Sequence, residues 1–107
     1  MGATFTAARA LAAARAADDG VYATLLGHGR LEIGFYAPVG SDAQEPHARD
    51  EIYVIISGNS QFACQGESRV CGRGDALFVP AGEPHRFHDF SEDFAAWVIF
   101  SGGDEPD

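Results

Sequence analysis

The amino-acid sequence predicts an all-β fold, an antiparallel barrel of the jelly-roll type with a short helix at its N-terminal end. About eight short apolar segments, separated by turns rich in Gly, Pro, Asn and Asp, follow one another from residue 21 to residue 100, as they do in small barrels. Residues 6–17 consist largely of alanine, the strongest helix former, and Asp18-Asp19-Gly20 ends this run. We therefore expect a helix followed by strands.

The length of the chain predicts one domain, because 107 residues can build a single hydrophobic core but not two. We divide the chain into a helical extension at 1–20, a barrel at 21–101 and an acidic tail at 102–107. The ranges expected to be strands are 21–26, 31–37, 52–56, 61–65, 68–71, 76–79, 85–90 and 94–100. In the second of these, Leu31, Ile33 and Phe35 alternate with other residues, so we expect these three to face the core.

The charge of the chain excludes two classes of partner. Sixteen acidic residues against seven basic ones give a formal charge of −9, which repels nucleic acid and anionic lipid. The alanine-rich start contains Arg9 and Arg15 and has no compact Leu/Val/Ile segment, so we expect neither a signal peptide nor a membrane span. A cytoplasmic protein is the resulting prediction.

Two cysteines, Cys64 and Cys71, flank the turn of a predicted hairpin. A four-residue loop would place them opposite each other, whereas a two-residue loop would offset them, and the sequence does not decide between these loops. In a reducing compartment, two half-buried thiols are favoured over a disulfide or a metal pair.

The chemistry of the chain is concentrated in the stretch from Glu45 to Gly58. Glu45, His47 and Glu51 have the same parity, so in an extended segment their side chains converge on one face. Pro46 favours this extended conformation over a helix. The following run, residues 52–56, is β-branched and aromatic throughout, which is typical of a strand covered on both faces.

A second stretch, residues 74–89, has a similar organisation. It contains a short apolar strand, a turn at Pro80-Ala81-Gly82 and then His85 at the entrance of another strand. Together the two stretches resemble the two conserved motifs of the cupin superfamily. Gly74, Pro80, Gly82 and His85 match the second motif in spacing, and Asp89 stands where that family usually has Asn.

In the first cupin motif, His47, Glu51 and Gly58 match the second His, the Glu and the closing Gly. Glu45 replaces the first His, which is the main departure of this chain from the family pattern. The resemblance covers roughly residues 30 to 100. It implies a double-stranded β-helix barrel, a bound divalent metal and a homodimer.

The resemblance implies a metal site formed by Glu45, His47, Glu51 and His85. Two His and two carboxylates would leave no net charge around a divalent ion, which favours Mn²⁺ or Fe²⁺, with Zn²⁺ and Ni²⁺ as alternatives. If Glu45 instead points away, two His and one carboxylate remain, an arrangement that supports oxygen chemistry. His28 and His88 are expected to lie on the surface.

The predicted function is the binding of a divalent metal and a small organic molecule inside the barrel. Phe35, Tyr53 and Phe87 are candidates for the apolar lining of the ligand pocket, with plain core packing as the alternative for each. The resemblance points to a metal-dependent dioxygenase first and to isomerases and lyases after it. A binding or sensing module without turnover is the competing class.

Overall fold

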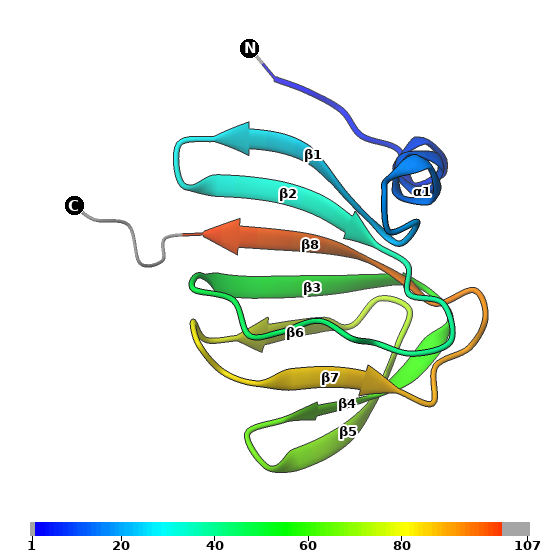
Figure 1. The fold of residues 1–107 in the computed structure, drawn as a ribbon, viewed down its shortest axis with the longest axis vertical. Coiled ribbons are helices and arrows are strands. Elements are labelled where there is room, and N and C mark those ends of the chain that lie inside the picture. Colours follow the sequence, from blue (N-terminus) through cyan, green and yellow to red (C-terminus); the bar gives the residue numbers. More distant parts are fainter. Residues whose placement is uncertain (1, 102–107) are drawn as a thin grey trace.

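A computed structural model describes residues 2–101, which form one helix and eight strands (Figure 1). The acidic tail predicted at 102–107 lies outside the described residues. The elements are α1 (Ala7–Ala16), β1 (Tyr22–His28), β2 (Leu31–Tyr36), β3 (Asp50–Ser57), β4 (Asn59–Cys64), β5 (Glu67–Gly72), β6 (Ala76–Val79), β7 (His85–His88) and β8 (Ala95–Ser101). The predicted fold class is therefore confirmed, and each predicted strand overlaps an observed one.

The strands form two antiparallel sheets. One has five strands in the order β1-β2-β8-β3-β6, and the other has three in the order β5-β4-β7. The hydrogen-bonded ladders of the described strands stay separate, so the two sheets form a sandwich-like barrel that backbone pairing does not close. Its interior contains Tyr53, Phe62, Phe87 and Phe94, whose rings pack against one another.

The side of strand β2 that points into the barrel differs from the prediction. Tyr36 belongs to the interior cluster, whereas Phe35 packs with Ala10 and Ala14 of α1 on the outer face of the five-stranded sheet. Successive residues of a strand point to opposite faces, so Leu31 and Ile33 point outward with Phe35. The alternation was identified correctly, but the helix covers the face that we expected to lie inside.

Helix α1 follows its sequence signals and covers part of that outer face. The side chain of Thr6 accepts a hydrogen bond from the backbone N–H of Arg9 and so caps the first turn. Ala10 and Ala14 are buried, because small side chains spaced by one helical turn let the helix approach the sheet closely. The guanidinium of Arg15 donates to the carbonyl of Ala37 at 2.8 Å, which fixes the helix to the end of β2.

The length of the turn between β4 and β5 determines whether the two cysteines lie opposite each other. Cys64 is the register partner of Glu67, and Cys71 is the partner of Ser60, so the loop has two residues and the cysteines are offset. Both cysteines are free thiols. Burial raises the pKa of each thiol, so neither is activated as a nucleophile.

Gly58 and Asp89 are among the residues of the cupin-like motifs that have left-handed backbone angles. Gly58 joins β3 to β4 at a φ of 74°, and a Cβ there would lie 2.8 Å from the Cα of Phe94. Asp89, where the motif usually has Asn, has a φ of 54°. Asn and Asp are the non-glycine residues that adopt this conformation most readily, so the replacement preserves the local geometry.

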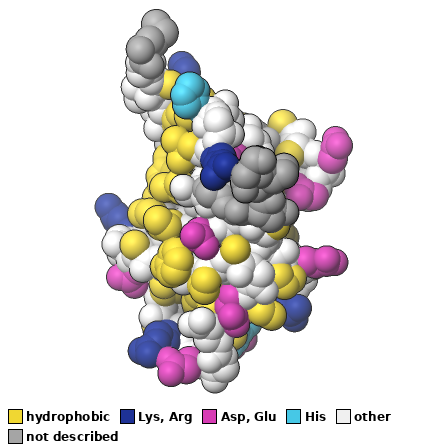
Figure 2. All heavy atoms as spheres, turned by 90° about the vertical axis from the view of Figure 1, so that its left-hand side faces the viewer, with side chains coloured by type: hydrophobic (Ala, Val, Ile, Leu, Met, Phe, Trp, Pro, Cys, Tyr) yellow, Lys and Arg dark blue, Asp and Glu magenta, His cyan; other side chains and the backbone are white. Residues whose placement is uncertain are grey.

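The outer face of the five-stranded sheet leaves several apolar side chains exposed beyond the helix. Ile52 and Phe78 are register partners on β3 and β6, and their exposed fractions are 39% and 61%. Figure 2 shows hydrophobic side chains gathered in a band along one side of the molecule. Among the described residues, no helix has the length and hydropathy that a membrane crossing requires.

Candidate metal centre

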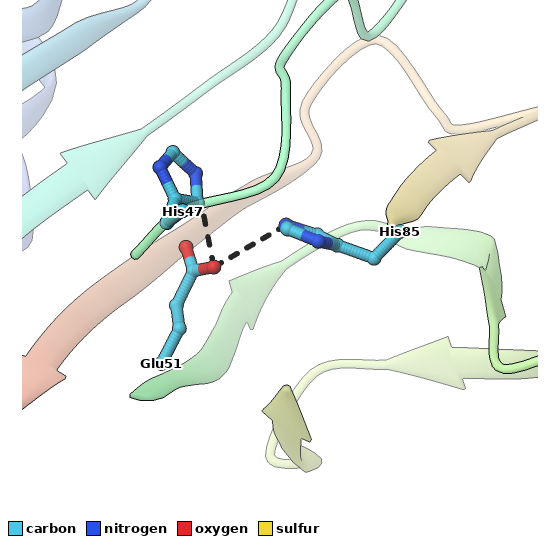
Figure 3. A group of neighbouring side chains, drawn as sticks. All are labelled: His47, Glu51 and His85. Atoms are coloured by element: carbon cyan, nitrogen blue, oxygen red, sulfur yellow. Dashed lines mark ion pairs between the residues drawn. The ribbon is translucent and has the colours of Figure 1, made fainter. Parts of the chain in front are cut away.

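Three predicted ligands lie together inside the barrel (Figure 3). His47, Glu51 and His85 each offer one ligand atom, and these three atoms lie within 4.8 Å of one another. The Nε2 atom of His85 is 3.2 Å from Oε1 of Glu51, and Nε2 of His47 is 3.8 Å from the same oxygen. Glu51 and His85 are buried, and His47 is half-buried at the edge of the group.

Backbone structure explains how these three side chains meet. Glu51 is the second residue of β3, on the inward face with Tyr53, while His85 opens β7 in the opposite sheet. The loop before β3 is tied to the turn before β7, because the Gly82 N–H donates to the carbonyl of His47 at 2.7 Å. This contact joins the two sequence motifs directly.

The hydrogen bonds of His85 determine which ring nitrogen faces the site. Nδ1 lies 2.9 Å from the backbone carbonyl of Glu83, which can only accept, so Nδ1 carries a proton. In the neutral ring Nε2 therefore has a lone pair, as a metal ligand requires. Burial alone would lower the pKa of His85, but the nearby Glu51 carboxylate and the Glu83 carbonyl favour the protonated ring, outweigh burial and raise it.

The side chain of Glu51 lacks the partners that a buried carboxylate needs. Its exposed fraction is 1%, and among the described residues neither oxygen has a hydrogen-bond partner. A neutral His85 would present a lone pair to a negative oxygen at 3.2 Å, which is repulsive. A cation between the two atoms, either a proton or a metal ion, removes this repulsion. The donor set of two imidazoles and one carboxylate thus fits a divalent metal.

Tyr53 and Gln44 complete the surroundings of the three ligands. The Tyr53 hydroxyl lies 3.0 Å from Nε2 of His85 and donates to Oε1 of Gln44 at 2.9 Å. Burial, and after it the charge of Glu51, raises the pKa of Tyr53 well above its usual value. The hydroxyl therefore stays protonated beside the site and has two possible acceptors for one proton.

Asp42 determines the orientation of the Gln44 amide. Its exposed fraction is 3%, and its carboxylate accepts hydrogen bonds from the Gln44 side-chain nitrogen at 2.9 Å and from the Tyr36 hydroxyl at 2.5 Å. A carboxylate only accepts, so the amide nitrogen must face Asp42 and the amide oxygen must face His47 and Tyr53. Asp42 also accepts from the Phe87 N–H at 2.8 Å, which fixes the loop onto β7.

The structure places the other predicted site residues as follows. Glu45 is exposed at the edge of the cavity and is not part of the three-ligand group. Tyr53 and Phe87 lie inside the barrel, where their rings pack at a centroid distance of 4.9 Å. Phe35 lies on the outer face under α1, for the reason of strand parity given above, and therefore does not line the cavity beside the ligands. His88 is partly exposed and contacts Ser68 and Asp89 on the surface.

An open cavity adjoins His47 and Glu51, whereas His85 does not contribute to its lining. Its volume is about 520 Å³, in the range of small-molecule sites. Its lining includes Tyr22, Glu32, Tyr36, Gln44, Glu45, His47, Arg49, Glu51 and Phe100. Gln44 and Asp42 were not predicted as site residues, although both lie in the Gly/Ser/Asp-rich loop directly before the first motif.

The position of Glu45 leads to a testable expectation. An exposed carboxylate outside the ligand group contributes little to coordination, so Glu45→Ala should change the Mn²⁺ and Zn²⁺ dissociation constants by less than about twofold. Calorimetric titration of the parent and the variant measures this. Glu45→His is the matched comparison, since it restores the usual motif. Tenfold weaker binding of both ions by Glu45→Ala would mean that Glu45 turns inward as a fourth ligand.

Comparisons with known proteins support the same fold and identify the family. Residues 33–100 match the family model described as a cupin domain. An uncharacterized protein of Streptomyces coelicolor is 42% identical over 93 residues, which are 85% of this chain and 89% of that protein. The dimethylsulfoniopropionate lyase DddQ of Ruegeria pomeroyi is 37% identical over 73 residues, 67% of this chain. The chain spans about a third of that lyase, since the match covers 34% of it.

Solved structures resemble the whole barrel. The crystal structure of DddQ from Ruegeria pomeroyi gives a TM-score of 0.67 at 29% identity, covering 87% of this chain and 54% of that one. A cupin 2 conserved barrel domain protein from Salinispora arenicola gives 0.69 at 17% identity, covering 95% and 89%. The family match, the two facing sheets and the positions of His47, Glu51 and His85 agree, and the chain belongs to the cupin family.

Proposed function

We propose that this cupin is a small metal-dependent lyase that holds one divalent ion at His47, Glu51 and His85 and acts on a small organic acid in the adjoining cavity. The observation that carries the proposal is the buried Glu51 carboxylate, whose oxygens have no hydrogen-bond partner among the described residues and face two imidazoles. The similarity to a dimethylsulfoniopropionate lyase supports the reaction class.

The residues of the chain have distinct roles in this proposal. A bound divalent ion would supply a Lewis acid that polarises a carboxylate or carbonyl oxygen of the substrate. Glu51 and His85 hold their ligand atoms in place through strand β3 and the Glu83 carbonyl. The Tyr53 hydroxyl donates to Oε1 of Gln44 and lies 3.0 Å from Nε2 of His85, which makes it the candidate for a hydrogen bond to the substrate at the centre.

The proposed ligand set has a net charge of +1 with a divalent ion, since it contains two neutral imidazoles and one carboxylate. This is one positive charge more than the set that includes Glu45. Mn²⁺ and Fe²⁺ remain our preferred ions, and the two nitrogen donors make Zn²⁺ and Ni²⁺ direct competitors. The homodimer implied by the cupin resemblance and the cytoplasmic location stay predictions.

A dioxygenase is the second candidate, because one observation favours it. Glu45 lies outside the ligand group, which leaves two His and one carboxylate, the ligand set of many non-haem iron oxygenases. This chemistry needs O₂ and Fe²⁺, whereas a lyase reaction needs neither.

One experiment separates the candidates. The protein is loaded with Mn²⁺, Zn²⁺ or Fe²⁺ and incubated with dimethylsulfoniopropionate with and without oxygen, while NMR follows the sulfonium methyl signal and an electrode follows O₂. A lyase removes that signal without oxygen, and His85→Ala abolishes the loss. Oxygen uptake with Fe²⁺ alone would support the dioxygenase, and metal binding without turnover of any tested organic acid would support a binding module.

A further inference from the structure

The outer part of the cavity contains a carboxylate and an aromatic ring, those of Glu32 and Phe100, which are not among the proposed metal ligands. Glu32, Phe100 and Glu51 are register partners on β2, β8 and β3, so they form a row across the inner face of the sheet. Two strand spacings separate the outer members of this row, about 10 Å between the backbones of Glu32 and Glu51. A small organic molecule can span that distance.

Arg49 places its positive charge in the middle of this row. Its guanidinium is 4.6 Å from the centroid of the Phe100 ring and 2.9 Å from Oε1 of Glu32. An aromatic face together with a carboxylate is the arrangement that binds organic cations in proteins. The side chain of Arg49 is 33% exposed at the cavity edge, so it has solvent beside it into which it can move.

The groups that donate hydrogen bonds to Glu32 keep its carboxylate charged in this position. Besides Arg49, the hydroxyls of Tyr22 and Thr24 donate to its other oxygen at 3.0 and 3.2 Å. Burial would raise the pKa of Glu32, but the hydrogen bonds from Arg49 and Tyr22 outweigh burial and lower it. The Tyr22 and Thr24 contacts would still hold the carboxylate in place after Arg49 had moved.

The charges of the cavity are distributed unevenly along its length. Its lining contains four carboxylates, those of Asp19, Glu32, Glu45 and Glu51, and Arg49 as its one arginine. With a divalent ion on Glu51 the inner end is positive. The outer end, with three carboxylates and one guanidinium, is negative. A ligand with an anionic and a cationic end matches this polarity.

We propose that Glu32 and Phe100 form a subsite for the cationic group of a small zwitterionic ligand. The guanidinium of Arg49 occupies this subsite in the free protein and moves out of it when the ligand binds. The ligand class is a short carboxylic acid that carries a quaternary ammonium or sulfonium group. The orientation follows from the charges, with the carboxylate at the metal and the onium group over Phe100. This deepens the proposed function and rests on it for the position of the carboxylate.

The opposite role for Arg49 is to stay in place and bind the carboxylate of the ligand itself. The two roles predict opposite effects of removing the guanidinium. If Arg49 competes for the subsite, its loss strengthens the binding of organic cations. If it anchors a carboxylate, its loss weakens the binding of acids.

The probes are two molecules of the same shape and one simple cation. We compare 3-(trimethylammonio)propionate with 4,4-dimethylpentanoate, in which carbon replaces the charged nitrogen, by calorimetry on protein loaded with Mn²⁺. Tetramethylammonium chloride is titrated into metal-free protein at constant ionic strength and followed by NMR. The onium acid should bind the parent about tenfold more tightly than 4,4-dimethylpentanoate, which lacks the positive charge, as expected for one organic cation on an aromatic face.

Two variants test the subsite, and a surface ion pair supplies matched controls. Arg49→Met keeps an apolar chain on Phe100 without the charge and should bind tetramethylammonium about fivefold more tightly. Glu32→Gln should abolish the preference for the onium acid. Arg69 and Glu67 form an exposed pair at 2.6 Å on β5, so Arg69→Met and Glu67→Gln make the same changes outside the cavity and should alter neither result. Thermal unfolding confirms that each variant is folded.

The outcomes separate this inference from the metal proposal. If metal-free protein binds tetramethylammonium, and Arg49→Met binds it more strongly, the subsite is supported. This result stands even if no metal binds and the proposed function fails. Normal metal binding with equal affinity for the two acids overturns the subsite and leaves the metal centre intact. Weaker binding of both acids by Arg49→Met overturns it as well, because Arg49 is then the carboxylate anchor.

Discussion

Replacing His85 by alanine should weaken divalent-metal binding by about 100-fold or more, since even outer partners of metal ligands contribute 10- to 100-fold. His85 is one of the three proposed ligands, and its Nε2 atom already faces Oε1 of Glu51 at 3.2 Å. Loss of the ring removes one donor and leaves the buried carboxylate beside an apolar space. Metal content after purification and the Mn²⁺ and Zn²⁺ dissociation constants measure the effect.

The controls for this prediction are the histidines that lie on the surface. His28→Ala and His88→Ala should retain the metal content of the parent, because His28 is exposed at the end of β1 and His88 contacts only surface groups. His85→Gln keeps much of the side-chain volume and shows whether a fold change causes the loss. The assignment fails if all of these variants retain the metal equally.

Addition of metal should also stabilise the parent against unfolding. A ligand that binds only the folded chain contributes about 2.7 kcal/mol at a concentration 100 times its dissociation constant. In this protein part of the gain comes from removing the conflict between Glu51 and the lone pair of His85. The shift in midpoint temperature should be absent in His85→Ala, which makes it a second readout of the same centre.

The sequence predicted the strands and the grouping of His47, Glu51 and His85 from local signals. It failed where the direction of a side chain depends on elements distant in the sequence. Alternation in β2 was visible, but two faces of a strand are equivalent until something covers one of them. Helix α1 covers Phe35 on the outer side of β2. On the inner side of the strand, Glu32 lines the cavity. Residues 31–36 alone therefore do not determine which side of β2 points into the barrel.

The grouping of His47, Glu51 and His85 was predictable from the two motifs. Glu51 has the same parity as His47, and the resemblance to the first motif assigned both side chains to the interior, while the turn from Pro80 to Gly82 placed His85 at the entrance of β7. Glu45 was different, because parity holds only in an extended segment. The loop before β3 is instead shaped by Asp42, whose contacts with Tyr36 and Phe87 reach 6 and 45 residues along the chain. Contacts at that separation leave no periodic signal.

Replacing Asp42 by alanine should therefore produce the largest loss of stability that we expect from a single substitution outside the ligands. The carboxylate is buried and accepts from the Tyr36 hydroxyl, the Phe87 N–H and the Gln44 side chain. Its removal leaves buried donors without acceptors, which should lower the free energy of unfolding by about 3 kcal/mol. For a domain of this size that corresponds to a fall in midpoint temperature of roughly 12 to 20 °C.

The matched control is another aspartate that accepts a backbone hydrogen bond across the same barrel. Asp50 accepts from the Ala81 N–H at 2.9 Å but is exposed, so water replaces the lost bond in Asp50→Ala and the cost should stay below about 1 kcal/mol. Asp42→Asn keeps one carbonyl oxygen and should fall between the two. Because Oδ2 of Asp42 accepts from both the Phe87 N–H and the Gln44 side-chain nitrogen, the Asn carbonyl should take that position and keep Gln44 oriented. The Asn amide nitrogen would then oppose the backbone N–H of Gln44 at the Oδ1 position.

The same variants connect stability to the metal centre. If Asp42 orients Gln44, then Asp42→Ala should weaken metal binding through His47 and Tyr53 by about 10-fold, as removal of outer partners does, while Asp42→Asn and Asp50→Ala leave it nearly unchanged. Denaturant unfolding and metal titration of these three variants measure both effects. Equal unfolding free energies for Asp42→Ala and Asp50→Ala would show that the carboxylate of Asp42 does not hold the loop on the barrel, and unchanged metal affinity in Asp42→Ala would separate the loop from the centre.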